Sequence, residues 1–266
     1  MDSLKRYLFT HVDAASLAVF RIGFGALLIF NSINEIFLCL SCKYLKPDML
    51  FKYHYFEWVK PWPSVIALNA HYIVMALCSI AIMLGYRYRL AMTLFTVLFS
   101  YTFLLDESLY LNHYYMVILF SIVMLFLPTN CLWSWDARKN IHIESRTIPR
   151  WCIVVLVIQL EIILIHAGLA KLNTDWLQLE PLRMWMHSSR PDFPEFFTTI
   201  TNDVGIALGA YGAIALHLLG APLLFFKRWR LWVIAAYACF HVINHFVFNI
   251  GTVSYTHLTL PTNREV

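Results

Sequence analysis

Ionisable side chains lie inside or at the ends of apolar stretches of this sequence, where such groups are costly and often functional. His113 opens one stretch, Lys171 closes another, and His241 and His245 lie in a third. Burial disfavours a lysine ammonium and lowers its pKa from the usual value of about 10.4, which turns lysine into a candidate base. Ionisable groups in apolar stretches usually face the interior of a helix bundle or a water-filled cavity.

Lys171 and His113 also have ordinary structural interpretations. A lysine at the end of a membrane span commonly extends its ammonium to the lipid headgroups. His113 lies among Tyr110, Tyr114 and Tyr115, a grouping typical of the aromatic belt at a membrane surface. The sequence alone leaves both interpretations open.

The sequence gives little support for a metal site. His241 and His245 are four residues apart and share a helix face, but no carboxylate or cysteine accompanies them at ligand spacing. Cys39 and Cys42 form a C-x-x-C without the second pair of a zinc site or the histidine of a haem-attachment site. We therefore predict no metal, and we favour coincidence over a redox pair for these cysteines.

Two carboxylates need an explanation of their own. Glu161 lies well inside an apolar helix, so it needs a partner or a proton. Arg21, in the first apolar stretch, is the expected partner. Asp175 follows Lys171 by four residues, and an ion pair would keep the lysine protonated. We therefore expect Asp175 to cap or anchor the following loop.

The composition requires a lipid environment for these stretches. Hydrophobic residues make up 60% and charged residues 14% of the 266 residues, and mean hydropathy is +0.63. Soluble domains are nearer half apolar and a quarter charged. We predict an all-α polytopic bundle of about seven transmembrane helices, each of about 20 residues. The spans are expected near residues 17–38, 63–84, 90–110, 112–127, 150–170, 204–226 and 231–250.

Two longer connections, Cys39–Trp62 and Lys171–Asp203, carry proline and tryptophan and are expected to hold interfacial structure. Eleven lysines and arginines lie on the same side of the predicted membrane as the N-terminus, and seven lie on the other side. Because positive charge is enriched on the cytoplasmic side, this predicts a cytoplasmic N-terminus. His113, Lys171, His241 and His245 then lie in the outer or lumenal half of the membrane. The net charge of +4 is scattered, so no nucleic-acid partner is expected. Transporters commonly have repeated halves and broken helices. The sequence shows neither feature, so a transporter is disfavoured.

Five stretches in the predicted spans and loops carry a family resemblance. They read LAVFRIGFGALLIF at 17–30, FEWVKPWP at 56–63, LDESLYLNHYYMVILFSIVMLFLPTNCLWSWD at 105–136, AGLAKLNTDW at 167–176 and FHVINHFVFNIG at 240–251. In this order they resemble the membrane domain of the vitamin K-dependent γ-glutamyl carboxylase family, including its bacterial relatives. Ala170 and Asn173 depart from the lysine and aspartate that are common in the family.

The resemblance implies an enzyme that couples hydroquinone oxygenation to glutamate γ-carboxylation. Reduced vitamin K or a related quinol, O2 and CO2 would be consumed, and a glutamate-containing protein or peptide would be the carboxylated partner. It implies that Lys171 is the base that deprotonates the hydroquinone and that His113 supports the lysine or the oxyanion. The residues expected to bind or support the quinol are Asn112, His241, Asn244, His245, Asp175 and Trp176.

Two alternatives remain at this point. One is a relative that performs only the epoxidation half of the reaction, and the other is a non-catalytic protein that binds quinone or lipid. Residues 1–251 are expected to form the carboxylase-like domain. Residues 252–266 are expected to be a non-native tail, because VSYTHLTLPT at 253–262 resembles a translated sequencing adaptor. The natural protein would then continue with further sequence that is absent here.

Overall fold

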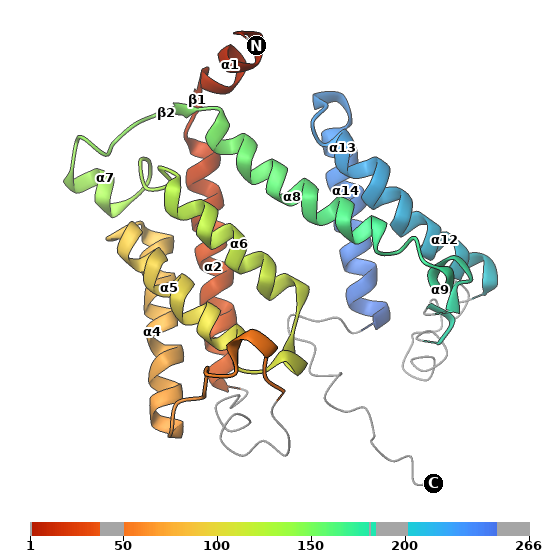
Figure 1. Cartoon of the computed structure of the whole chain (residues 1–266). Coiled ribbons are helices and arrows are strands. Elements are labelled where there is room, and N and C mark those ends of the chain that lie inside the picture. The colour runs from red at the N-terminus through yellow and green to blue at the C-terminus, as the bar shows by residue number, and fades with distance from the viewer. Residues whose placement is uncertain (1, 38–50, 181, 185–201, 249–266) are drawn as a thin grey trace. The chain divides into compact units, whose positions relative to one another are not determined.

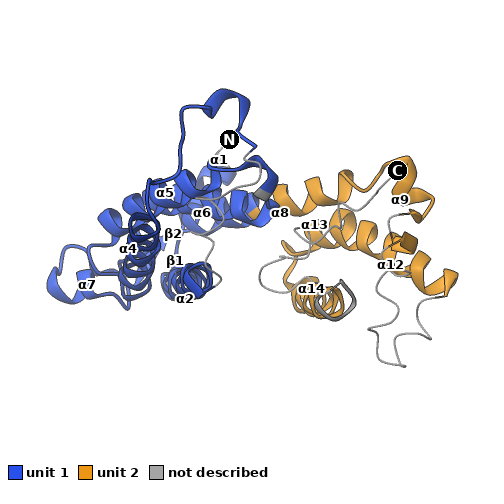
Figure 2. Cartoon of the chain, turned by 90° about the horizontal axis from the view of Figure 1, so that it is seen from below, with its two compact units in different colours: residues 1–159 blue, residues 160–266 orange. Residues whose placement is uncertain are grey.

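The computed structural model describes residues 2–37, 51–180, 182–184 and 202–248. The chain divides into two compact units, residues 1–159 and 160–266 (Figure 2). Helix α8, Trp151–Leu169, crosses the boundary between them. The predicted tail 252–266, the C-x-x-C of Cys39 and Cys42, and residues 185–201 of the second long connection lie outside the described residues.

A helix stands at each of the seven predicted apolar positions (Figure 1). They are α2 Ala15–Phe37, α4 Val65–Leu84, α5 Tyr88–Phe103, α6 Asn112–Phe126, α8, α12 Asp203–Ala215 with its continuation to Leu223, and α14 Lys227–Phe248. Four segments are long and apolar enough to cross a bilayer: Ala15–Phe37, Val65–Leu84, Trp151–Leu169 and Asp203–Leu223. The prediction of a helical membrane protein is confirmed, and the count of about seven spans stays a prediction.

Helix α5 is shorter than the expected span 90–110. It ends at Phe103 and is followed by a 3-10 turn, Glu107–Leu109, which the side chain of Asp106 caps by accepting a hydrogen bond from the backbone N–H of Ser108 at 2.9 Å. The carboxylate favours this turn over further helix, because aspartate competes for nearby backbone donors.

In unit 1, helices α2, α4, α5 and α6 pack in sequence order. At Gly25, α2 and α4 approach so closely that an added Cβ would lie 2.7 Å from the Cα of Met83. Small residues allow such close backbone packing between membrane helices. The segment before α2 is joined to the segment before α8 by a two-stranded antiparallel sheet of β1 (His11–Asp13) and β2 (Thr147–Pro149).

Arg21 holds one end of unit 1 together. Its side chain is completely buried, and its hydrogen bonds within the described part of the chain all go to backbone carbonyls. Nε lies 3.0 Å from the oxygen of Thr129, Nη1 lies 3.0 and 2.6 Å from those of Ile82 and Met83, and Nη2 lies 3.4 and 2.7 Å from those of Leu132 and Trp133. The guanidinium therefore caps the C-terminal end of α4 and shapes the loop after α6.

The expected pair of Arg21 with Glu161 is not what the structure shows. The guanidinium donors are occupied by carbonyl oxygens, and neither carboxylate oxygen of Glu161 has a hydrogen-bond partner among the described residues. The physical reason is that helix and loop ends present carbonyls without helical partners, and these oxygens occupy the N–H donors of the buried guanidinium.

The described part of the first long connection, residues 51–62, packs on the opposite end of unit 1. It contains a 3-10 turn at His54–Phe56. The hydroxyl of Tyr101 donates to the carbonyl of Lys60 at 2.7 Å, and the indole N–H of Trp62 donates to Nδ1 of buried His71 at 3.4 Å. This segment packs on the helix ends, and its placement at the membrane interface stays a prediction.

Unit 2 contains the end of α8, the short helix α9 (Thr174–Leu177), α12, a π-helical turn (η4, Leu216–Gly220), α13 (Ala221–Leu223) and α14. Leu182, Ile206 and Ala210 form a buried apolar cluster against which Trp176 and Leu179 pack. The turn after α8 is thereby fixed to the first half of α12.

Candidate functional site

Lys171 lies in the turn that directly follows α8. Its Nζ donates a hydrogen bond to the carbonyl of Ala167 at 3.0 Å and lies 5.4 Å from the centre of the Trp176 ring. The side chain is half-buried, and no ion pair joins it to a carboxylate among the described residues. The lysine therefore points back along α8 and lies over an aromatic face.

Asn173 caps α9, the role that was predicted for Asp175. The Oδ1 of Asn173 accepts from the backbone N–H of Trp176 at 2.9 Å, and its Nδ2 donates to the carbonyl of Ala170 at 2.9 Å. Asp175 lies in the first turn of α9, where a carboxylate is favoured by the helix dipole. Asparagine is a strong N-cap residue, so its side chain fixes the turn that carries Lys171.

His217 lies in the π-helical turn that interrupts the sixth apolar segment. The ring is buried, and Nδ1 lies 2.6 Å from the carbonyl oxygen of Ala213, to which it donates a hydrogen bond. Tyr237 and Phe240 of α14 pack edge-on against it, at 5.7 and 5.4 Å between ring centres. Single π turns are frequent at functional sites.

The end of α8 packs tightly against this turn. A Cβ added to Gly168 would lie 2.9 Å from the Cβ of His217 and 2.7 Å from Cδ2 of Leu218. His217 also lies within electrostatic range of both Lys171 and His241. The predicted residues Lys171 and His241, the latter exposed, thus lie on the elements that pack around a histidine that was noted in the sequence but was not assigned to the site.

Tyr237 completes this group from α14. Its hydroxyl donates to the carbonyl of Leu216, the first residue of the π turn, at 3.0 Å, and its ring is stacked on that of His241 at 6.5 Å. Glu161 is buried on α8 and lies within electrostatic range of Tyr237.

The other predicted residues lie as follows. Asn112 and His113 occupy the exposed first turn of α6 in unit 1, and the His113 ring meets the Tyr114 ring edge-on at 4.9 Å. The Tyr114 hydroxyl donates to Oε1 of buried Glu35 at 2.6 Å, which anchors that turn to α2. Asn244 is half-buried on α14. His245 is on the same helix, and its side chain is outside the described residues.

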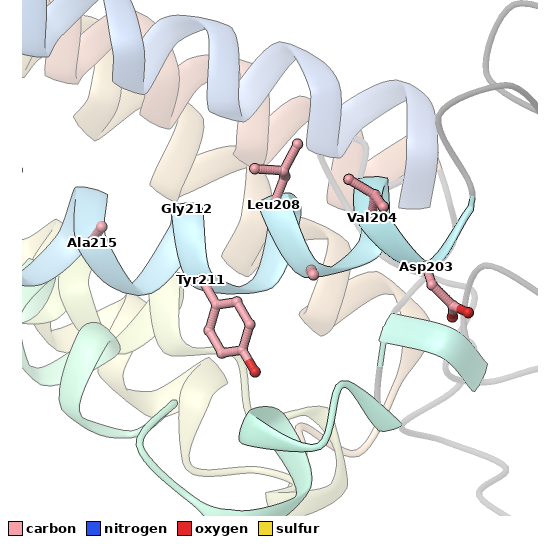
Figure 3. Close-up of a pocket in the computed structure, with 7 residues that line it drawn as sticks. Asp203, Val204, Leu208, Tyr211, Gly212 and Ala215 are labelled. Carbon is pink, nitrogen blue, oxygen red and sulfur yellow. The ribbon is translucent and has the colours of Figure 1, made fainter.

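An apolar groove of about 480 Å³ follows one face of α12 (Figure 3). Val204, Leu208, Tyr211 and Ala215 line it, and the hydroxyl of Tyr211 donates to the carbonyl of Leu177 at 2.9 Å. The groove belongs to a candidate membrane span and contains no predicted site residue. In the part of the chain that the structure describes, no group of three or more histidine, cysteine, aspartate or glutamate side chains is placed to hold a metal ion.

The long apolar helices, with ionisable groups at a helix end and in a π turn, define a polytopic helical membrane protein. The sequence model of the HTTM domain matches residues 9–262, and the chain belongs to that family. The HTTM domain is the membrane domain of vitamin K-dependent γ-carboxylase and related proteins, so the family resemblance is confirmed. No solved structure matches the chain.

Gly168→Ala is expected to lower the thermal stability of the purified protein relative to Gly212→Ala. Both changes gain similar helix propensity. At Gly168 the new methyl group overlaps the Cβ of His217, whereas at Gly212 nothing lies within 4 Å. Overpacking of this kind costs about 1–3 kcal/mol. Melting curves in detergent measure the difference, and equal melting temperatures for the two variants would show that α8 and the π turn are not packed this tightly.

Proposed function

We propose that this protein is a quinol-dependent membrane enzyme of the γ-glutamyl carboxylase type, in which Lys171 is the base that deprotonates the hydroquinone. The observation that carries the proposal is the environment of Lys171. A half-buried ammonium with a carbonyl and an aromatic ring as its described partners is poorly compensated compared with one paired to a carboxylate.

Burial lowers the pKa of Lys171. The Trp176 ring acts in the opposite direction, because a cation over an aromatic face is stabilised by about 0.5–1 kcal/mol at exposed sites. Because desolvation lowers this pKa, the neutral amine is more accessible than in an ordinary surface lysine. Neutral Nζ can then accept a proton from a hydroquinone hydroxyl, and the resulting ammonium is held by the Ala167 carbonyl and the Trp176 ring.

His217 and Tyr237 act in this proposal as positioning residues. Tyr237 holds the first carbonyl of the π turn, and the turn holds His217 against Gly168, three residues before Lys171. The position of the base is therefore determined by packing rather than by the flexible turn alone, as general-base catalysis requires. The family resemblance adds His113 as the residue that supports the oxyanion, and His113→Ala tests that assignment separately.

The test is an assay of membranes that contain the full chain, supplied with vitamin K hydroquinone, labelled bicarbonate and a glutamate-containing peptide. Quinone epoxide and labelled peptide are both expected. Epoxide without labelled peptide would assign the chain to oxygenation alone. A protein that binds the quinone but forms neither product would be a non-catalytic binder, and the proposal would be wrong.

A further inference from the structure

One end of unit 1 gathers the ends of three candidate membrane spans. Arg21 ties α2 to the last turn of α4 and to the loop after α6, and the β1–β2 pairing joins the segments that precede α2 and α8. Because α2, α4 and α8 are candidate spans, the bilayer surface passes close to Ala15, Leu84 and Trp151. Residues beyond these helix ends therefore lie at the level of the lipid headgroups.

The segments at this end carry unpaired positive charge. Arg87 and Arg89 flank the start of α5, and Arg138 and Lys139 end α7 (Trp135–Lys139). These four side chains belong to exposed residues and form no ion pair with a carboxylate among the described residues. Cations at a membrane surface attract anionic lipid headgroups.

Hydrogen bonds from backbone and side-chain N–H groups occupy the nearby carboxylate Asp136, and it forms no ion pair with these four cations. Its Oδ1 accepts from the N–H of Arg87 at 2.8 Å, and its Oδ2 accepts from the N–H of Tyr88 and from Nδ2 of Asn130, both at 2.9 Å. These bonds hold Arg87 in the left-handed region, with φ of 42°. Such a conformation is strained for a residue other than glycine and is often retained at a functional position.

A pocket of about 490 Å³ lies between these elements, lined by Arg87, Arg89, Asn130, Asp136 and His142 among others. Exposed aromatic residues surround the same helix ends: Tyr86, Trp133 and Trp135 are 43%, 57% and 48% exposed. Tryptophan and tyrosine favour the headgroup region of a membrane. The pocket therefore combines cations, polar groups and an aromatic border at the depth of a phospholipid phosphate.

The described part of the opposite end of unit 1 has a different charge. There Lys52 and Lys60 are accompanied by Glu57, Asp106 and Glu107, so no excess of positive charge arises. The excess of positive charge is therefore at the end of unit 1 that carries Arg87 and Arg89, and that end is the better partner for anionic lipid.

We propose that the pocket between the start of α5 and the loop 128–143 binds the headgroup phosphate of an anionic phospholipid, held by Arg87 and Arg89. The lipid anchors this end of the helix bundle in one leaflet. The site is independent of the quinol chemistry, because it uses none of the residues assigned to proton transfer.

The experiment measures the melting temperature of the full chain in dodecyl maltoside micelles during titration with dioleoylphosphatidylglycerol, dioleoylphosphatidylcholine or inorganic phosphate. Phosphatidylglycerol alone is expected to raise the melting temperature. The double variant Arg87→Asn/Arg89→Gln removes both charges, and asparagine tolerates the left-handed conformation at position 87. Its affinity for phosphatidylglycerol is expected to fall about 30-fold, since each cation near a membrane surface contributes about 1 kcal/mol.

The matched control is Lys52→Gln/Lys60→Gln, which removes two charges from the opposite end and is expected to bind phosphatidylglycerol as the unaltered protein does. Arg89→Gln alone, in regular helix, is expected to weaken binding about fivefold and serves if the double variant does not fold. The proposal is overturned if phosphatidylcholine or inorganic phosphate stabilises the protein equally. It is also overturned if the control loses as much affinity as the double variant, or if Arg89→Gln binds unchanged.

Discussion

Lys171→Arg is expected to abolish epoxide formation from a hydroquinone while leaving the purified protein folded. Arginine stays charged at every accessible pH, so it cannot accept the proton. It does, however, reach the same carbonyl and the same aromatic face, the contacts that Nζ makes with Ala167 and Trp176. A lysine whose role is to extend toward headgroups would be replaced by arginine without loss. The expected decrease in rate is about 10²–10⁴-fold, the usual contribution of a general base.

Lys139→Arg is the matched control for this substitution. Lys139 also lies over a tryptophan, with Nζ 5.7 Å from the centre of the Trp135 ring, but Lys139 is exposed whereas Lys171 is half-buried. The control is expected to form epoxide at the unaltered rate. Lys171→Ala should be inactive as well, and a small primary amine that enters the site is expected to restore part of the activity. Near-normal epoxidation by Lys171→Arg would show that Lys171 is not the base.

The pH dependence of epoxidation gives a second measurement on the same residue. Because burial lowers the pKa of Lys171, the neutral amine becomes the main form at a lower pH than in a surface lysine. The rate is therefore expected to rise with pH through the lowered pKa and to level above it. The midpoint of the rise should lie below about 10.4. Lys171→Ala supplemented with an amine should instead follow the pKa of the added amine.

Arg21→Met is expected to prevent the protein from accumulating in a folded form. Methionine fills part of the volume but leaves five buried or partly buried carbonyl groups without the guanidinium, of which that of Ile82 keeps the N–H of Gly85. Each buried polar group that loses its partner costs about 1–3 kcal/mol, and the total exceeds the range of ordinary substitutions. Arg21→Lys should be intermediate, since an ammonium has three donors. The yield of monodisperse protein on size-exclusion chromatography and the melting temperature measure both effects.

Arg138→Met is the control for Arg21, since it removes an exposed arginine from the same unit. Substitutions at exposed positions usually change the free energy of unfolding by less than about 0.5 kcal/mol. A folded Arg21→Met protein with an unaltered melting temperature would show that the carbonyl-capping role of Arg21 contributes little to stability.

The sequence was sufficient to locate the helices and the family. Apolar runs of about 20 residues are a local property, and a helix appears at each predicted position, from Ala15–Phe37 to Lys227–Phe248. The motifs around His113 and Lys171 are also local, and they led to the family that the HTTM match confirms. The end of α5 was predicted too late, because the capping preference of Asp106 competes with an apolar run that extends as far as Leu105.

Only the tertiary structure decided which groups meet. Arg21 was expected to seek the carboxylate of Glu161, but its partners are backbone carbonyls from two distant segments, which no pattern of side chains reveals. The same is true of His217, which lies within electrostatic range of Lys171 and His241 because the π turn that carries it packs against Gly168. Hydropathy and motif spacing describe positions along one chain. The partners of a buried polar group depend on which backbone groups are left unbonded at helix ends and turns once the helices have packed, and that is determined only in three dimensions.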